Sequence, residues 1–169
     1  MRTAAYKVDV ASDRRRRENE PKHILCAIAG WKGKIMELFL GGCYQGKKEY
    51  VLKLHPECKG QVIEGENLPA DWDGMIKELQ EFENPVINHL HLWVRKCLEQ
   101  QADVELLADK LLETYPGLIF ICDEIGNGIV PMDALERDYR EQTGRLQIRI
   151  AEKAERVERI VCGISQRLK

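Results

Sequence analysis

From Met36 onward, short apolar runs alternate with longer stretches whose apolar residues recur every three or four positions. Short continuous runs are typical of strands covered on both faces, and the longer spacing is typical of amphipathic helices. The runs predict strands at 37–40, 61–63, 85–92, 118–122 and 157–161. The spaced stretches predict helices at 47–54, 71–82, 93–98, 104–115 and 133–153. This alternation predicts an α/β fold, a mostly parallel sheet with helices on both faces.

The first 35 residues differ from the rest. Four consecutive arginines, 14–17, precede a short polar stretch that ends at Pro21. A run of like charge is typical of a solvated segment, so residues 1–35 are predicted to be a mobile extension or a mis-assigned start. The folded domain is expected over 36–169, with Met36 opening its first strand.

Composition narrows the function classes. Of 169 residues, 44% are hydrophobic and 32% charged, and the net charge is −2. This balance disfavours a nucleic-acid partner, and no apolar stretch reaches the length of a membrane span, so a soluble cytoplasmic protein is expected. Six scattered cysteines without a C-x-x-C pair favour buried free thiols over disulfides or a zinc site.

The strongest motif lies between the first strand and the first helix. It fits the phosphate-loop pattern G-x-x-x-x-G-K and predicts a nucleotide site, which consists of Gly41, Gly42, Cys43, Tyr44, Gln45, Gly46, Lys47 and Lys48. Glycines let backbone N–H groups turn towards an anion, and the following helix directs its positive end at the phosphates. Lys47 is expected to contact the β- and γ-phosphates and to act in catalysis.

Lys48 departs from this motif, because a Ser or Thr hydroxyl normally ligates Mg²⁺ at that position. Three interpretations stay open. Other groups hold Mg²⁺, or nucleotide binds poorly, or a second ammonium partly replaces the charge of the metal.

A second motif ends the apolar run at 118–122 with Asp123 and Glu124, as in a Walker B element. Asp123 is a candidate ligand for Mg²⁺, and Glu124 is a candidate catalytic residue that orients or deprotonates a nucleophile. The alternative is a strand that ends in a polar turn.

Arginines follow on the last predicted helix. Arg137, Arg140 and Arg145 suit phosphate contacts, but for at least two of them pairing with acidic neighbours three or four residues away is favoured. The acidic neighbours are Asp133, Glu136 and Glu141.

Two histidines, His89 and His91, alternate on the strand predicted at 85–92. They are interpreted as satisfied polar positions near a strand end, with a place facing the nucleotide as the alternative.

These motifs together resemble a known family. The runs E-I-G-N-G-I-V-P at 124–131, R-D-Y-R at 137–140 and G-R at 144–145 are similar to N-E-V-G-x-G-I-V-P, R-x-F-R-D and G-R-x-N-Q. Those patterns belong to the bifunctional adenosylcobinamide kinase / adenosylcobinamide-phosphate guanylyltransferase family of cobalamin biosynthesis. The loop at 41–48 is similar to that family's G-G-A-R-S-G-K-S, and the segment 86–93 resembles its D-C-L-T-L-W strand end.

The resemblance implies a P-loop, RecA-like sheet and a two-step activity. ATP or GTP would phosphorylate the aminopropanol hydroxyl of adenosylcobinamide, and GMP would then pass from GTP through a covalent histidine. It also implies a homo-oligomer. The resemblance also implies Mg²⁺ with the nucleotide, although Lys48 replaces the hydroxyl that would ligate it.

Departures from the family pattern indicate a diverged member. The histidine of the family's segment H-x-x-x-R-P-x-x-W is missing, because residues 58–85 contain none. Asn88 replaces an acidic residue, Asp123 an asparagine, and Gln147 with Ile148 an Asn-Gln pair. We therefore expect the guanylyl transfer to be lost and the kinase step to be kept. The alternatives are a silent nucleotide-binding or regulatory paralogue, and a retained fold with a dead nucleotide site.

Overall fold

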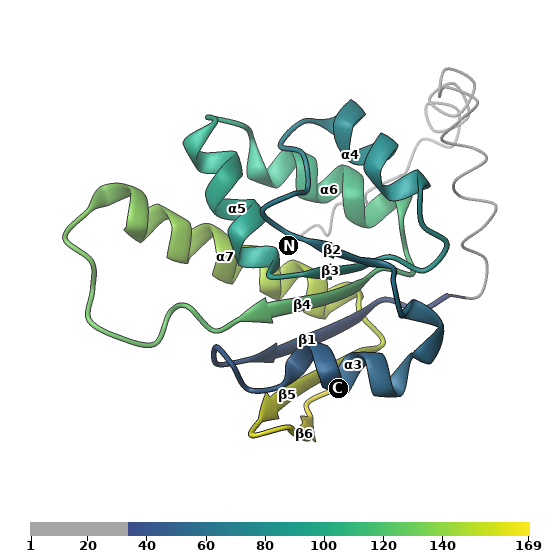
Figure 1. Ribbon diagram of the computed structural model, residues 1–169. Helices are drawn as coiled ribbons and strands as arrows, with labels where there is room; N and C mark the ends of the chain where they lie inside the picture. The colour runs from purple at the N-terminus through teal and green to yellow at the C-terminus, as the bar shows by residue number, and fades with distance from the viewer. Residues whose placement is uncertain (1–33) are drawn as a thin grey trace, which may run out of the picture.

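The computed structural model describes residues 34–169, which alternate strands and helices (Figure 1). The elements in chain order are β1 (Glu37–Gly41), α3 (Lys47–Leu54), the short 3₁₀ helix η1 (Pro56–Cys58), β2 (Val62–Glu64), α4 (Trp72–Gln80), β3 (Val86–Asn88), α5 (Leu90–Glu99), α6 (Val104–Thr114), β4 (Ile119–Asp123), α7 (Ala134–Lys153), β5 (Arg156–Val161) and β6 (Ile164–Arg167).

One six-stranded sheet of these residues has the order β2-β3-β4-β1-β5-β6. Strands β1 to β5 run parallel, and β6 returns antiparallel to β5 at the edge. The carboxyl ends of β1 and β4 are in register, with Gly41 opposite Asp123. Ligands of open parallel sheets bind at the carboxyl ends of the strands. The loop after β1 therefore lies where a binding site is expected.

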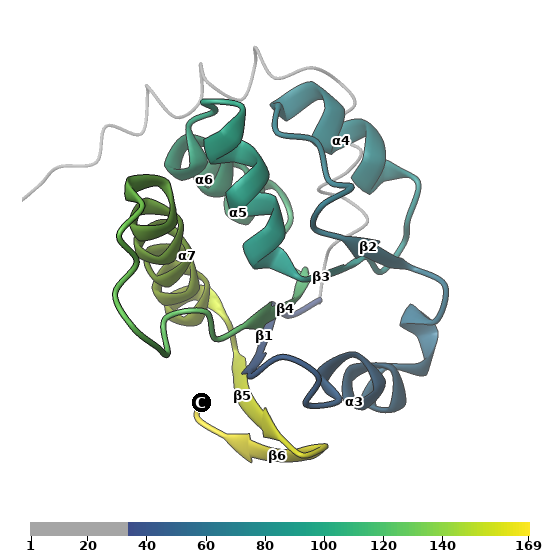
Figure 2. The same cartoon turned by 60° about the vertical axis from the view of Figure 1, so that its left-hand side comes forward.

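Helices cover both faces of the sheet unequally. Helices α4, α5, α6 and α7 pack on one face around the buried side chains of Leu38, Ile87 and Phe120. The other face carries α3 and η1, which pack over Phe39 and Ile121 (Figures 1 and 2). The predicted P-loop-type α/β fold, with a mostly parallel, RecA-like sheet and helices on both faces, is confirmed.

Aspartates begin three of the helices. Asp71, Asp103 and Asp133 each accept a hydrogen bond from a backbone N–H of the following turn, at 2.8–3.0 Å. A cap of this kind stabilises a helix by about 1 kcal/mol, because it satisfies an N–H group that has no intrahelical acceptor. Asp103 in this way fixes the start of α6.

The strand predicted at 85–92 is wrong beyond Asn88. His89 has a left-handed backbone, with φ of 50°, and α5 begins at Leu90. The reason is the spacing of Leu90, Trp93, Val94 and Cys97, which are all buried on one helical face. His91 therefore lies in the first turn of a helix.

The structure tests only some of the expectations about the N-terminal extension, the cysteines, the location and the oligomeric state. Residues 1–33, including Cys26, lie outside the described residues, so the extension stays a prediction. No helix in the described part is long and apolar enough to cross a membrane. Among the described cysteines all are free; Cys43 and Cys162 are exposed, so only three are buried as predicted. The cytoplasmic location and the homo-oligomer stay predictions.

Candidate nucleotide site

The loop from Gly41 to Lys48 turns sharply between β1 and α3. Gly41 has φ of 154° and Gly46 has φ of 80°, and both conformations favour glycine. No side chain caps the start of α3 at Gly46. The N–H groups of the first helical turn have no intrahelical acceptor and are therefore available to an anion.

Lys47 is the charged group at the centre of this loop. Its side chain is buried, and its Nζ lies 2.6 Å from Oδ1 of Asp123 at the end of β4. The same Nζ donates to the carbonyl of Gly42 at 2.7 Å. The ammonium thus lies across the loop, where a phosphate oxygen could replace either partner.

Lys48 joins a second polar cluster, at the carboxyl ends of β2 and β3. Its Nζ donates to Oε1 of Glu64 at 2.8 Å. The other oxygen of Glu64 contacts the amide of Asn88 at 2.7 Å and Nδ1 of His89 at 2.8 Å. Burial raises the pKa of Glu64, but the hydrogen bonds from Lys48, His89 and Asn88 outweigh it and leave the pKa below its usual value.

Lys47 and the cluster around Lys48 line one cavity of about 540 Å³. Its lining residues are Cys43, Tyr44, Gln45, Gly46, Lys47, Lys48, Glu49, Glu64, Asn88 and His89. This volume lies within the range of pockets for small molecules and cofactors, and the lining joins the whole carboxyl-terminal half of the loop to the ends of β2 and β3.

His91, in the first turn of α5, forms a hydrogen bond with the carboxyl end of β4. The backbone N–H of Asp123 donates to its Nδ1 at 3.3 Å. Burial lowers the pKa of His91 to about 4, although the Asp123 carboxylate opposes this shift. A neutral imidazole with an acceptor Nδ1 matches the hydrogen bond, so the histidine is a structural support for Asp123.

The protonation of His91 predicts an acid-labile fold. Its folded-state pKa of about 4 lies below the ordinary histidine value of 6.5, so the unfolded chain binds more protons between these values. Stability should therefore fall as the pH drops through this window, by about 2 kcal/mol from pH 7 to pH 5. Urea unfolding of the wild type and of His91→Gln at both pH values measures this loss. An equal pH dependence in the two proteins would contradict the prediction.

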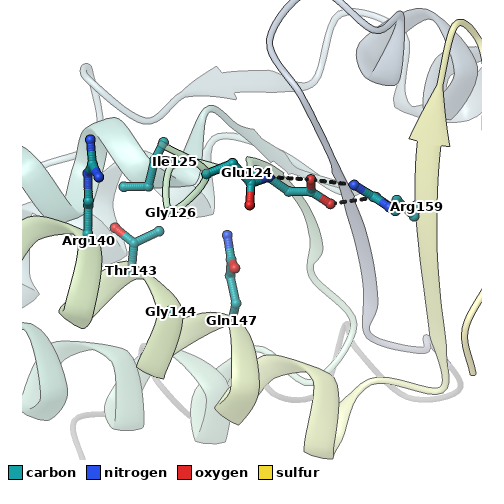
Figure 3. A pocket seen from close by; sticks show the side chains of 9 residues that line it. Glu124, Ile125, Gly126, Arg140, Thr143, Gly144, Gln147 and Arg159 are labelled. Atoms are coloured by element: carbon teal, nitrogen blue, oxygen red, sulfur yellow. Dashed lines mark hydrogen bonds and ion pairs between the residues drawn. The ribbon is translucent and has the colours of Figure 1, made fainter. Parts of the chain in front are cut away.

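Glu124 lies in a second, smaller cavity of about 330 Å³, between the loop after β4, helix α7 and β5 (Figure 3). Its carboxylate takes a two-pronged ion pair from Arg159 on β5, at 2.7 and 2.8 Å. Thr143 and Gln147 line the cavity from α7. The backbone N–H of Glu124 donates to the Gly41 carbonyl at 3.0 Å, so this cavity adjoins the start of the phosphate loop.

The arginines of α7 only partly follow the predicted pairing. Arg145 contacts Glu141 at 2.6 Å as expected. Arg137 donates instead to the carbonyls of Pro131 and Met132, and Arg140 to that of Ile129. Pairing for at least two of the three is therefore wrong. The loop before α7 folds back over the helix and offers these guanidinium groups carbonyl oxygens.

The structure brings most predicted site residues together. Lys47 forms an ion pair with Asp123. Lys47 and Lys48 both line the cavity of about 540 Å³, whereas the Glu124 side chain lies in the cavity of about 330 Å³. Sequence reasoning missed Glu64 and Arg159. Glu64 is the last residue of the three-residue strand β2, and Arg159 lies in β5. Neither residue belongs to a recognisable sequence motif.

Comparison with known proteins decides the family. A family model described as cobinamide kinase / cobinamide phosphate guanyltransferase matches residues 49–168. The chain belongs to this family. The matched segment begins directly after Lys48, so the assignment of the phosphate loop rests on its own geometry.

Two curated relatives agree with this membership. The bifunctional adenosylcobalamin biosynthesis protein CobU of Salmonella typhimurium is 28% identical over 108 residues, which cover 64% of this chain and 49% of the relative. The bifunctional adenosylcobalamin biosynthesis protein CobP of Pseudomonas aeruginosa is 32% identical over 90 residues, covering 50% and 52%. The matched part of this chain thus spans about half the length of each relative.

The donor set at the loop does not fit Mg²⁺, the ion that usually accompanies a nucleoside triphosphate. Mg²⁺ takes oxygen ligands in near-octahedral geometry. Position 48 offers an ammonium, and the nearby carboxylates of Asp123 and Glu64 are each bound to a lysine. Within residues 34–169, no three His, Cys, Asp or Glu side chains gather closely enough to hold a metal ion.

Proposed function

We propose that this protein binds ATP or GTP at Gly41–Lys48 and transfers the γ-phosphoryl group to the hydroxyl of adenosylcobinamide. The observation that carries the proposal is Lys47, a buried ammonium placed across a glycine-shaped loop at the head of α3. A buried lysine directed along such a loop suits the β- and γ-phosphates of a nucleotide. Family membership and the names of both relatives support cobinamide as the acceptor.

The second cavity suits the acceptor arm. Its volume of about 330 Å³ accommodates a small hydroxyl-bearing arm, but not a whole corrinoid. Thr143 is almost fully buried there and its hydroxyl has no protein partner among the described residues, so a ligand could satisfy it. The cavity adjoins Gly41, so an acceptor bound in it would lie beside the phosphate loop.

Glu124 is the proposed general base of the transfer. The acceptor oxygen attacks the γ-phosphorus, the bond from that phosphorus to the bridging oxygen of the β-phosphate breaks, and the nucleoside diphosphate leaves. The hydroxyl proton passes to the Glu124 carboxylate. Because Arg159 holds this carboxylate from one side, the arginine must release it or share it with the acceptor.

The guanylyl transfer is proposed to be lost. Pro69 and Trp72 keep the spacing of P-x-x-W in the family pattern H-x-x-x-R-P-x-x-W, and counting back places Glu64 at the histidine. A carboxylate held by Lys48, Asn88 and His89 stands there instead. The family's phosphoramidate therefore has no nitrogen at this position.

A silent nucleotide-binding or regulatory paralogue is the second candidate. It is favoured by the ion pairs that occupy both Lys47 and Lys48 and by the Arg159 contact on Glu124. Turnover separates the two candidates, because a silent paralogue binds nucleotide without transferring it.

A turnover assay with purified protein, adenosylcobinamide and either ATP or GTP tests the proposal. We expect adenosylcobinamide phosphate from the wild type, and no GDP-cobinamide when GTP is the donor. Glu124→Gln should lower kcat at least about 100-fold with an unchanged nucleotide affinity, because it removes the base and keeps the shape. Nucleotide binding without any product would reject the kinase in favour of the silent paralogue.

A further inference from the structure

Lys48 occupies the position at which the motif normally supplies a metal-ligating hydroxyl, yet it belongs to the site. Its ammonium lies 2.8 Å from Oε1 of Glu64, and both residues line the cavity beside the phosphate loop. Its side chain is 40% exposed, so it retains the freedom to turn towards a ligand. This makes Lys48 a second cation in the cavity, beside Lys47.

We infer that the phosphate loop takes the metal-free nucleoside triphosphate, with the Lys48 ammonium in the electrostatic role that Mg²⁺ has elsewhere. The inference rests on the proposed nucleotide binding and defines the form of its ligand. A free triphosphate carries more negative charge than its Mg²⁺ complex, and two lysines in one cavity suit that charge. A metal ion beside the γ-phosphate would instead face the like charge of Lys48.

The other contacts of Glu64 allow Lys48 to leave its carboxylate for a phosphate. When Lys48 turns to a phosphate, the carboxylate keeps the amide of Asn88 and the ring nitrogen of His89 as partners. It therefore does not become an uncompensated charge at the cavity wall.

Calorimetry of ATP and GTP binding, in EDTA and in excess Mg²⁺, tests the inference. The wild type should bind the metal-free form at least three-fold more tightly than the Mg²⁺ complex. Lys48→Ser restores the hydroxyl of the motif, and it should weaken metal-free binding at least ten-fold and make Mg²⁺ favourable. Lys53→Ser, an exposed lysine in the last turn of the same helix, is the matched control and should behave as the wild type.

Inorganic triphosphate, titrated into the wild type under both conditions, provides a measurement that needs no variant. Triphosphate should also bind more tightly in EDTA than in Mg²⁺, since the nucleobase takes no part in the effect. An affinity that Mg²⁺ raises ten-fold in the wild type would overturn the inference while leaving the proposed kinase intact. Absence of nucleotide binding under both conditions would overturn the kinase proposal and the inference together.

Discussion

Gly41→Ala should lower the free energy of unfolding by about 3 to 5 kcal/mol, since it combines backbone strain with a steric overlap. A Cβ at this position would lie 2.3 Å from the carbonyl oxygen of Ile160 on β5. The φ of 154° is also unfavourable for an L side chain. Because β1 lies between β4 and β5, the overlap cannot be relieved without opening the sheet beside the phosphate loop.

Urea unfolding followed by circular dichroism measures this loss. Gly144→Ala is the matched control, because it lies inside α7 and a Cβ there would meet no atom within 4 Å. That variant should gain up to about 1 kcal/mol from helix propensity. Equal stabilities of the two variants would show that the close approach of Gly41 to β5 does not exist.

Lys47→Met should destabilise the fold by about 3 to 5 kcal/mol, because it leaves the buried Asp123 carboxylate without its counter-charge. Both side chains are less than 10% exposed and their charged atoms lie 2.6 Å apart. Changing Asp123 to Asn in the same chain removes the stranded charge and should recover most of the loss. The two changes together should therefore cost less than the sum of the separate changes.

Lys48→Met is the control for this cycle. Its partner Glu64 is 28% exposed and keeps two further hydrogen bonds, so the change should cost at most about 1 kcal/mol. A loss at Lys47 no larger than the loss at Lys48 would contradict the buried ion pair.

The sequence predicted the parts of the site that local rules determine. The phosphate loop followed from its glycine spacing between an apolar run and a helix, and the run before Asp123 showed a strand covered on both faces. Parallel strands align their carboxyl ends, which is why two motifs some 75 residues apart could be expected to meet. In the structure the two motifs do meet, at the contact between Lys47 and Asp123.

Contacts between distant segments could not be predicted in the same way. Glu64 acquires its role through Lys48 and His89, and Arg159 through Glu124, and no local pattern connects these positions. The histidines were misplaced because a short apolar run fits a strand or a helix start equally well. Burial of Leu90 and Trp93 on one face decided for the helix.

Nucleotide binding is the most direct test of the central claim that Gly41–Lys48 is a working phosphate loop. Isothermal calorimetry would compare the wild type with Lys47→Met/Asp123→Asn, a variant expected to fold, each with ATP and GTP in EDTA and in Mg²⁺. The account predicts saturable binding by the wild type and at least a 100-fold weaker affinity of the variant. Equal affinities, or no binding by the wild type at millimolar nucleotide, would contradict it.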